Sequence, residues 1–478
     1  MSHSSHRKTK IVATLGPASA DRETITQMIA AGMNVVRLNF SHGEHATHRR
    51  IAGWVREAAA SAGRSVAILQ DIQGPKIRLG TFPGGALELE QGATLRALPG
   101  NGQAAGGTLQ IDYPHLLEDL EIGQEILLVD GQVRLRVAAR HDDFLEVEVL
   151  QGGRVGDRQG AAFPRAALRV RAVTEKDRED LAFGRSLGVD YVAASFVSSA
   201  ADIETVSQLV ARETPIIAKI ELAAAYENLR EILAASHGAM VARGDLGVEM
   251  ELERLPSIQS QILEHTNRCG DVSITATEML ESMTHNWRPT RAEVTDVSSA
   301  VLDGTDAVML SGETAIGDHP VRVIEMMDRI CRAAESEPRH QSRPTIDFLA
   351  SEAPVPSATT RAAVEAADAL ELSTIVAFTE SGSTARLLSK YRPHARILAF
   401  TPEQRTYRRM ALYWGVEPRT FERIDSTDEM LLMAERQLLA EGVVTAGETV
   451  LMVAGIPPNR RSSTNFMKFH QISAEGRP

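Results

Sequence analysis

The feature that most constrains this chain is an alternation of short apolar runs with helix-like segments. The runs are rich in β-branched residues, end in polar or charged side chains, and lie at Ile11, Val35, Val66, Tyr191, Ile216, Met240, Ser273 and Ala307. Eight consecutive βα units predict a closed (β/α)8 barrel (a TIM barrel), whose active site forms at the carboxyl ends of the strands. A doubly wound open sheet is the alternative, but it would not need polar residues at all eight strand ends.

Two stretches depart from this alternation. From about residue 81 to 171, glycine-rich turns such as NGQAAGG separate short β-like runs, which predicts an inserted all-β domain with one short helix near 114–119. A polar, proline-containing segment at 337–356 indicates a linker, after which an α/β pattern resumes. The predicted domains are the barrel (1–74 and 171–344), the inserted β-rich domain (75–170) and a C-terminal α/β domain (345–478).

The fifth and sixth strands carry the most informative polar ends. IIAKIEL contains Lys219 and Glu221, and GAMVARGDLGVE contains Arg243 and Asp245. Because side chains alternate along a strand, each pair is predicted to share one face. Two carboxylates from neighbouring strand ends suit a hard cation such as Mg²⁺, with waters and substrate phosphates as further ligands. Structural salt bridges at the strand ends are an equally good interpretation of these residues alone.

Two other stretches could bind a ligand. In NVVRLNFSHG, Arg37, Asn39 and Ser41 alternate with apolar residues and are predicted to line one face. In the C-terminal domain a hydroxyl-rich turn joins a strand to a helix. It could hold a phosphate at the helix N-terminus, or it could be an ordinary N-cap cluster. Its hydroxyl residues are Thr379, Ser381, Ser383 and Thr384.

Bulk properties exclude several classes of protein. The net charge of −12 argues against a general nucleic-acid binder, which would carry a basic stripe. Cys269 and Cys331 form no CxxC motif and are expected to be inert thiols. The N-terminus lacks the apolar region of a signal peptide, and no uncharged apolar run approaches the ~18 residues of a membrane span. A cytoplasmic protein with no membrane partner is expected.

Taken in order, the motifs of this chain resemble those of pyruvate kinase over nearly its whole length. They are TKIVATLGPAS, GMNVVRLNFSHG, DIQGPKIR, EKD, GVDYVAASF, AKIEL, MVARGDLGVE, SITATEML with RPTRAE, and DGTDAVMLSGETAIGDHP. The resemblance implies a barrel with a β-rich lid inserted after its third strand, and a C-terminal effector-binding domain. It implies a glycolytic, allosterically regulated phosphotransferase, commonly a homotetramer, that transfers the phosphoryl group of phosphoenolpyruvate to ADP and gives pyruvate and ATP.

The resemblance also implies roles for residues at the strand ends. Lys219 would act on the phosphoryl group in transfer, where positioned charge matters more than covalent chemistry. Glu221 and Asp245 would hold Mg²⁺ or Mn²⁺ between the enolate and phosphoryl oxygens. Arg37 would bind the phosphate of phosphoenolpyruvate. Arg243 has two open interpretations, a role at the site and a supporting ion pair.

Further roles concern the substrate carboxylate, the nucleotide and the effector. The backbone N–H groups of Gly244 and Asp245 would receive the carboxylate, helped by Thr277, which borders the carbon that gains a proton. The effector phosphate, from a phosphorylated sugar or a nucleotide monophosphate, would bind the turn from Thr379 to Thr384. The nucleotide phosphates would meet Asn39, His42 and Arg78.

The lid departs from the family pattern in two ways. It reads Asp157-Arg158-Gln159-Gly160 where the family often has a lysine facing the nucleotide, so Arg158 supplies this charge or the contact is lost. The return segment FPRAALRVRAVTEKD replaces the usual LPxLxEKD, which leaves the hinge geometry open.

A third departure concerns potassium. Most members carry Thr-Lys and then Glu where this chain has Ile72, Gln73 and Lys76. Members with Glu need a monovalent cation, which residues matching Asn39, Ser41 and Asp71 help to hold. Lys76 could replace that cation with Asp71 as its partner, because two unit charges 4 Å apart interact by ~4 kcal/mol at an effective dielectric of 20. The chain resembles the branch that works without K⁺; the alternative is a solvent-facing Lys76 with K⁺ still bound.

Two other functions fit parts of this pattern. A catalytically silent, metabolite-binding relative would be expected to have lost Lys219, Glu221 or Asp245, and all three are present. Another phosphoenolpyruvate or pyruvate barrel enzyme, such as a class II aldolase-like lyase, would not need the inserted lid or the C-terminal domain.

Overall fold

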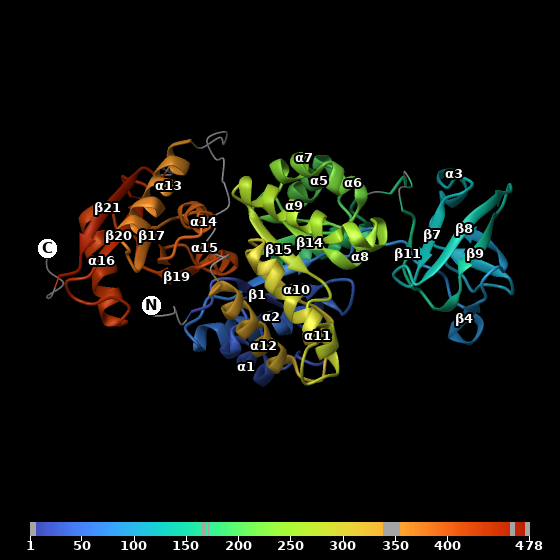
Figure 1. Ribbon diagram of the computed structural model, residues 1–478, viewed down its shortest axis with the longest axis horizontal. Coiled ribbons are helices and arrows are strands. Elements are labelled where there is room, and N and C mark those ends of the chain that lie inside the picture. Colours follow the sequence, from blue (N-terminus) through green and yellow to red (C-terminus); the bar gives the residue numbers. More distant parts are fainter. Residues whose placement is uncertain are drawn as a thin grey trace.

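The computed structural model describes residues 6–164, 166, 168–170, 172–337, 354–458 and 464–473. Three lobes lie in a row, with the barrel in the middle, the β-rich domain at one end and the C-terminal domain at the other (Figure 1). In the described part of the chain, no helix has both the length and the apolar character that a membrane span requires.

Eight parallel strands close the barrel in the order β1-β2-β3-β12-β13-β14-β15-β16, and β16 pairs with β1. The sequence predicted each of these strands, so the closed barrel is confirmed and the open sheet is wrong. The strands are β1 (Lys10–Thr14), β2 (Val35–Asn39), β3 (Ala67–Asp71), β12 (Tyr191–Ala194), β13 (Ile216–Ile220), β14 (Gly238–Ala242), β15 (Val272–Ala276) and β16 (Ala307–Leu310).

Helices cover the outside of the barrel, and local sequence explains where several of them begin and end. The helix α4 starts with the predicted capping box between Thr174 and Asp177, and α1 ends at Gly32, whose φ is 118°. The helices are α1 (Arg22–Ala31), α2 (His45–Ser61), α4 (Glu175–Leu187), α5 (Ala200–Leu209), α6 (Ala223–Glu227), α7 (Leu229–Ala235), α8 (Arg243–Glu249), α9 (Leu255–Arg268), α10 (Arg291–Leu302), α11 (Gly312–Ala315) and α12 (Pro320–Glu335).

The inserted domain lies between β3 and α4 and has an apolar core of its own. It consists of a six-stranded sheet, β11-β7-β8-β9-β5-β6, and a two-stranded sheet, β10-β4. The short helix α3 occurs where the sequence predicted one. The elements are β4 (Ala86–Leu89), β5 (Thr94–Pro99), β6 (Thr108–Ile111), α3 (Leu116–Asp119), β7 (Glu125–Leu128), β8 (Val133–Arg140), β9 (Leu145–Gln151), β10 (Gly153–Gly156) and β11 (Ala161–Ala162).

The C-terminal domain is a five-stranded sheet, β19-β18-β17-β20-β21, in which only β21 is antiparallel to its neighbour. Its elements are α13 (Pro354–Ala369), β17 (Thr374–Phe378), α14 (Ser383–Lys390), β18 (Arg396–Thr401), α15 (Gln404–Arg409), β19 (Val416–Thr420), α16 (Thr427–Ala440), β20 (Thr449–Ala454) and β21 (Phe466–Gln471). The predicted domain boundary at 344/345 lies outside the described residues; the boundaries at 74/75 and 170/171 stay predictions.

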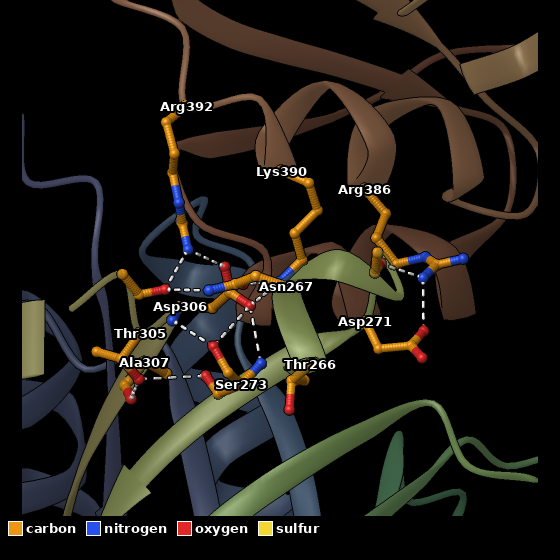
Figure 2. A network of polar contacts seen from close by, with 12 residues as sticks. Thr266, Asn267, Asp271, Ser273, Thr305, Asp306, Ala307, Arg386, Lys390 and Arg392 are labelled. Carbon is orange, nitrogen blue, oxygen red and sulfur yellow. Dashed lines mark hydrogen bonds and ion pairs between the residues drawn. The ribbon is translucent and has the colours of Figure 1, made fainter. Parts of the chain in front are cut away.

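A buried polar network attaches the C-terminal domain to the amino ends of the barrel strands (Figure 2). Asp306, just before β16, receives Lys390 from the end of α14 and lies 2.9 Å from Nη2 of Arg392. Its second oxygen also accepts the backbone N–H of Ser273 at 2.8 Å. Because a buried carboxylate is costly unless it is paired, both domains are needed to satisfy these charges.

The apolar core continues across the same junction. Inward-facing barrel residues such as Val12 and Ile274 belong to one cluster with Ile375 and Val416 of the C-terminal domain. At its edge, Nζ of the buried Lys10 donates to the carbonyl oxygen of Val416 at 2.8 Å. The C-terminal domain thus closes the amino end of the barrel and leaves the carboxyl ends of the strands to face the β-rich domain (Figure 1).

Candidate active site

Four charged side chains meet at the carboxyl ends of β2, β3 and β13. Nε of Arg37 lies 2.6 Å from Oδ2 of Asp71, and Nζ of Lys219 lies 3.4 Å from Oδ1 of the same carboxylate. Lys219 also lies 2.6 Å from Oε1 of Glu221. The sequence had placed Lys219 and Glu221 on one face, and these two side chains do meet.

The buried charges shift one another's titration. Burial raises the pKa of Asp71, but Lys219 and Arg37 outweigh this effect and hold it below its ordinary value. Burial lowers the pKa of Lys219, but Asp71 and Glu221 raise it above its ordinary value. The ammonium form of Lys219 is therefore stable at the base of the site.

Ser195 and Phe196 complete this cluster, and sequence reasoning missed both. Nζ of Lys219 donates to Oγ of Ser195 at 2.7 Å, and the Phe196 N–H donates to Oε2 of Glu221 at 2.8 Å. Phe196 has a φ of 53°, a left-handed conformation that is rare for a bulky residue. The polar end of the run DYVAASF was the only available signal.

The predicted strand face shared by Arg243 and Asp245 is wrong. The strand β14 ends at Ala242, and α8 begins at Arg243. Residues two apart on a helix point about 200° apart, so the two side chains diverge. Nη1 of Arg243 lies 2.7 and 2.6 Å from the two carboxylate oxygens of Asp296, which supports the ion-pair interpretation of Arg243.

Lys76 binds Asp245, so the predicted partner, Asp71, is wrong. Nζ of Lys76 donates to Oδ1 of Asp245 at 3.1 Å. Asp71 is already paired with Arg37 and Lys219, so its negative charge is compensated without a third cation. Lys76 is only 31% exposed, and it does not simply point to solvent. Ile72, next to Asp71, is buried.

Thr277 follows β15 and lies against α8. Its φ is 72°, and a Cβ added to Gly244 would come within 2.9 Å of its Cγ2 methyl group. The close approach requires glycine at position 244. The structure therefore brings Thr277, Gly244 and Asp245 to one side of the barrel mouth.

Asn39, His42 and Arg78, which are predicted to bind the nucleotide phosphates, each have a different partner in the structure. Oδ1 of Asn39, the last residue of β2, accepts the backbone N–H of Ser41 at 3.1 Å, and the carbonyl oxygen of His42 contacts Nε2 of His48 at 3.0 Å. Arg78, at the root of the inserted domain, donates to the carbonyl oxygen of Arg158 at 3.0 Å. Arg37, Asn39 and Ser41 do not form one continuous binding face, because β2 ends at Asn39.

In the turn 157–160 of the inserted domain, Arg158 is the only cation, and it is exposed. The side-chain oxygen of Gln159 accepts the Gly156 N–H at 2.8 Å, and Asp157 accepts the Phe82 N–H at 2.7 Å. Both side chains therefore stabilise the turn itself. Arg158, with a φ of 56°, extends its side chain into solvent.

The hydroxyl-rich turn of the C-terminal domain has both buried and exposed members. The Gly382 N–H donates to Oγ1 of Thr379 at 2.9 Å, and the Thr384 hydroxyl contacts that of Thr464 at 2.7 Å in a buried position. Ser381 and Ser383 are exposed and 3.1 Å apart between their hydroxyl oxygens. The turn therefore presents two hydroxyl groups to solvent at the start of α14.

Glu221 and Asp245 are the residues that could hold a divalent cation. Burial raises the pKa of Glu221, Lys219 opposes this, and the nearby Asp245 raises it further. Oε1 of Glu221 has no hydrogen-bond donor aligned with it in the described part of the chain. No group of three or more His, Cys, Asp or Glu side chains that could hold a metal occurs among the described residues. Two carboxylates fit Mg²⁺, which is usually held by one or two protein carboxylates and keeps water and substrate oxygens as its other ligands.

Comparisons with known proteins give consistent matches. A family model described as "Pyruvate kinase, barrel domain" matches residues 6–324, and one described as "Pyruvate kinase, alpha/beta domain" matches residues 357–470. The pyruvate kinase of Geobacillus stearothermophilus is 42% identical over 98% of this chain and 81% of its own length. The pyruvate kinase of Corynebacterium glutamicum is 40% identical over 98% of this chain and 99% of its own length.

A solved structure agrees with these sequence matches. The crystal structure of a pyruvate kinase from Cryptosporidium parvum superposes with a TM-score of 0.90 at 34% identity. The superposition covers 98% of this chain and 96% of the other.

The pair of carboxylates leads to a prediction about cation binding in the absence of substrates. Glu221→Gln and Asp245→Asn should each weaken Mn²⁺ binding, measured by electron paramagnetic resonance, because each removes an anionic ligand. Glu313→Gln is the matched control, since Glu313 is buried on α11, after β16, and accepts backbone N–H groups instead. Unchanged Mn²⁺ affinity in both site variants would mean that the carboxylates form structural salt bridges only.

Proposed function

The chain belongs to the pyruvate kinase family, and we propose that the barrel mouth, loaded with Mg²⁺ or Mn²⁺ but without K⁺, transfers the phosphoryl group of phosphoenolpyruvate to ADP. The observation that carries this proposal is the buried ammonium of Lys219, which lies within 3.4 Å of Asp71, Glu221 and Ser195. The catalytically silent alternative is disfavoured because Lys219, Glu221 and Asp245 are all present. The lyase alternative does not account for the β-rich and C-terminal domains.

Lys219 and Arg37 supply the fixed positive charge that phosphoryl transfer needs. Arg37 is held by Asp71 and by the Thr14 hydroxyl, to which its Nη1 donates at 3.0 Å. Both cations therefore need little reorganisation when a phosphate enters, and preorganised charge is the main source of catalysis in such reactions. A divalent cation held by Glu221 and Asp245 would neutralise the developing enolate and phosphoryl charge when bound.

Thr277 and α8 would orient the rest of the substrate. The backbone N–H groups of Gly244 and Asp245 are available at the first turn of α8, where the N–H groups have no partner within the helix. They would receive the carboxylate of phosphoenolpyruvate. The Thr277 hydroxyl, on the adjacent turn, would border the carbon that gains a proton as the enolate becomes pyruvate.

The proposed reaction is tested by following ATP formed from phosphoenolpyruvate and ADP in a coupled assay. Lys219→Met should lower kcat by ~10²–10³ or more, because one preorganised electrostatic group typically contributes that factor. Lys8→Met, the same substitution near the amino end of the barrel, should leave kcat unchanged. More than a tenth of the original activity in Lys219→Met would contradict the role of Lys219, and no ATP from the unsubstituted chain would contradict the function.

The potassium-independent reaction is supported by the contact of Lys76 with Asp245. This contact places the amino group of Lys76 3.1 Å from a proposed metal ligand. The residues that would otherwise hold a monovalent cation have other partners here: Asp71 binds Arg37 and Lys219, and Asn39 binds the Ser41 backbone. Lys76 therefore supplies the positive charge in place of the monovalent cation. It does so beside Asp245, and not beside Asp71 as the sequence suggested.

The potassium test uses tetramethylammonium buffers with Mg²⁺ and without K⁺, NH₄⁺ or Na⁺. The chain should reach its full rate there, and added KCl should have no more effect than added tetramethylammonium chloride. Lys76→Glu should lower the rate, and the double variant Lys76→Glu/Ile72→Thr should regain part of it only when K⁺ is added. A strong activation of the unsubstituted chain by KCl would overturn the proposal.

Effector binding at the hydroxyl-rich turn is the regulatory part of the proposal. Ser381 and Ser383 are exposed beside the first turn of α14, and the N-terminus of a helix favours an anion. The opposite end of α14 carries Lys390, which binds Asp306 of the barrel. A phosphorylated sugar or nucleotide monophosphate at the turn would therefore contact a helix that is attached to the barrel at its other end.

Ser383→Glu should abolish the effect of such an effector on the phosphoenolpyruvate dependence, because it places a negative charge where the phosphate binds. The measurement is the KM for phosphoenolpyruvate with and without each of a panel of phosphorylated sugars and nucleoside monophosphates. Ser186→Glu, which adds the same charge on an exposed site of α4, is the control. An unchanged response in Ser383→Glu would place the effector elsewhere. In the unsubstituted chain, phosphoenolpyruvate should change the affinity for the effector by the same factor as the effector changes the affinity for phosphoenolpyruvate.

A homotetramer in the cytoplasm completes the proposal. Apolar side chains are exposed on the edge strand β21, at Met467 and Phe469, and on the barrel, at Leu252, Trp287 and Ile316. Such residues are frequent in contacts between identical subunits. Sedimentation velocity tests the assembly, and a stable monomer at micromolar concentration would contradict it. The proposal also includes an inserted domain that begins after residue 74 and ends at residue 170.

A further inference from the structure

Thr277 and Glu278 form a turn that needs outside support. Both follow β15, and their φ angles are 72° and 54°. Two consecutive residues with side chains in the left-handed region cost free energy, so the turn persists only where the surroundings stabilise it. Thr277 is half-buried and Glu278 is exposed, so apolar packing around them does not supply this support.

One guanidinium group supplies it instead. Nη2 of Arg243 donates to the Thr277 carbonyl oxygen at 2.6 Å, and Nε donates to the Ala276 and Thr277 carbonyl oxygens at 3.2 and 3.1 Å. Arg243 is 9% exposed, so these bonds have little competition from water. Gly244 is the next residue, and a Cβ at this position would come within 2.9 Å of the Thr277 methyl group, so the same dipeptide lies against both the backbone and the side chain of Thr277.

Asp296 in turn holds Arg243. The carboxylate receives Nη1 of Arg243 through both oxygens, at 2.7 and 2.6 Å, from a position on α10 outside the strands. The start of α10 is itself anchored by a capping box between Thr290 and Glu293. The planar guanidinium therefore connects a rigid helix to the Thr277 turn with a defined orientation.

We infer that Asp296 is a positioning residue for the reaction: acting through Arg243, it orients the Thr277 hydroxyl toward the carbon that gains a proton, without touching the substrate. This inference rests on the proposed function, because it assumes that Thr277 borders that carbon. It assigns a role in proton transfer to a carboxylate at the outer edge of the barrel mouth, separate from the phosphoryl and metal contacts of Lys219 and Glu221.

The test isolates proton transfer from phosphoryl transfer. In D₂O, with Mg²⁺ and ATP present, pyruvate should lose a methyl proton to give the enolate and regain a deuteron, which proton NMR follows. Asp296→Asn should slow this exchange by about 10–100-fold, a usual loss when a supporting partner of a site residue is removed. Asp296→Glu, which keeps the carboxylate, should recover part of the rate. Mn²⁺ affinity without substrate should be unchanged in both variants.

A double-mutant cycle decides whether Asp296 acts through Thr277. In the Thr277→Val background, Asp296→Asn should cause no further loss of exchange, because the group that it positions is already absent. If the losses of exchange rate caused by Thr277→Val and by Asp296→Asn multiply in the double variant, the inference is overturned. An undiminished exchange in Thr277→Val alone would instead contradict the proposed role of Thr277. Asp328→Asn is the matched control, since it breaks an Arg–Asp pair with Arg7 near the amino end of the barrel, and exchange should be unaffected.

Discussion

Closure of eight parallel strands is the constraint on which the other features of this molecule depend. It brings the carboxyl ends of β2, β3 and β13 to one rim, so that Arg37, Asp71 and Lys219, far apart in sequence, come into contact. An unpaired charge in such a position would be very costly, and each of these groups is tolerated because its neighbours have the opposite sign. The same low-dielectric surroundings make the fixed cationic groups of Arg37 and Lys219 effective toward an incoming phosphate.

The two ends of the barrel use buried charge differently. At the amino end, Asp306 is paired with Lys390 and Arg392 and accepts the Ser273 N–H, and the C-terminal domain covers the group (Figure 2). At the carboxyl end, Glu221 is paired with Lys219 and Asp245 with Lys76, at a rim that faces the β-rich domain. Charges shared between two domains fix the domains together, whereas carboxylates and cations at the rim of the barrel are suited to binding and chemistry.

Much of this arrangement could be predicted from the sequence because its signals are local. Apolar runs with polar ends identified all eight strands, and the period of two placed Lys219 beside Glu221. The errors lie where a strand ends or a partner is distant. The sequence does not show whether Arg243 continues β14 or starts α8. This difference of one residue in the end of the strand changes the direction in which the Arg243 side chain points. Lys76 and Asp245 are separated by 169 positions, so no local pattern could pair them. Ser195 gave no signal beyond its place at the end of a strand.

The central claim is that Glu221 and Asp245 hold a divalent cation beside Lys219, with the substrate carboxylate at Gly244 and Thr277. A crystal of the chain grown with Mn²⁺ and oxalate, a mimic of the enolate, tests this most directly. We expect an anomalous peak bonded to one oxygen from each of Glu221 and Asp245, with oxalate bound to that ion and in contact with the Thr277 hydroxyl. Manganese bound elsewhere, with Lys219 still paired to an unligated Glu221, would contradict it.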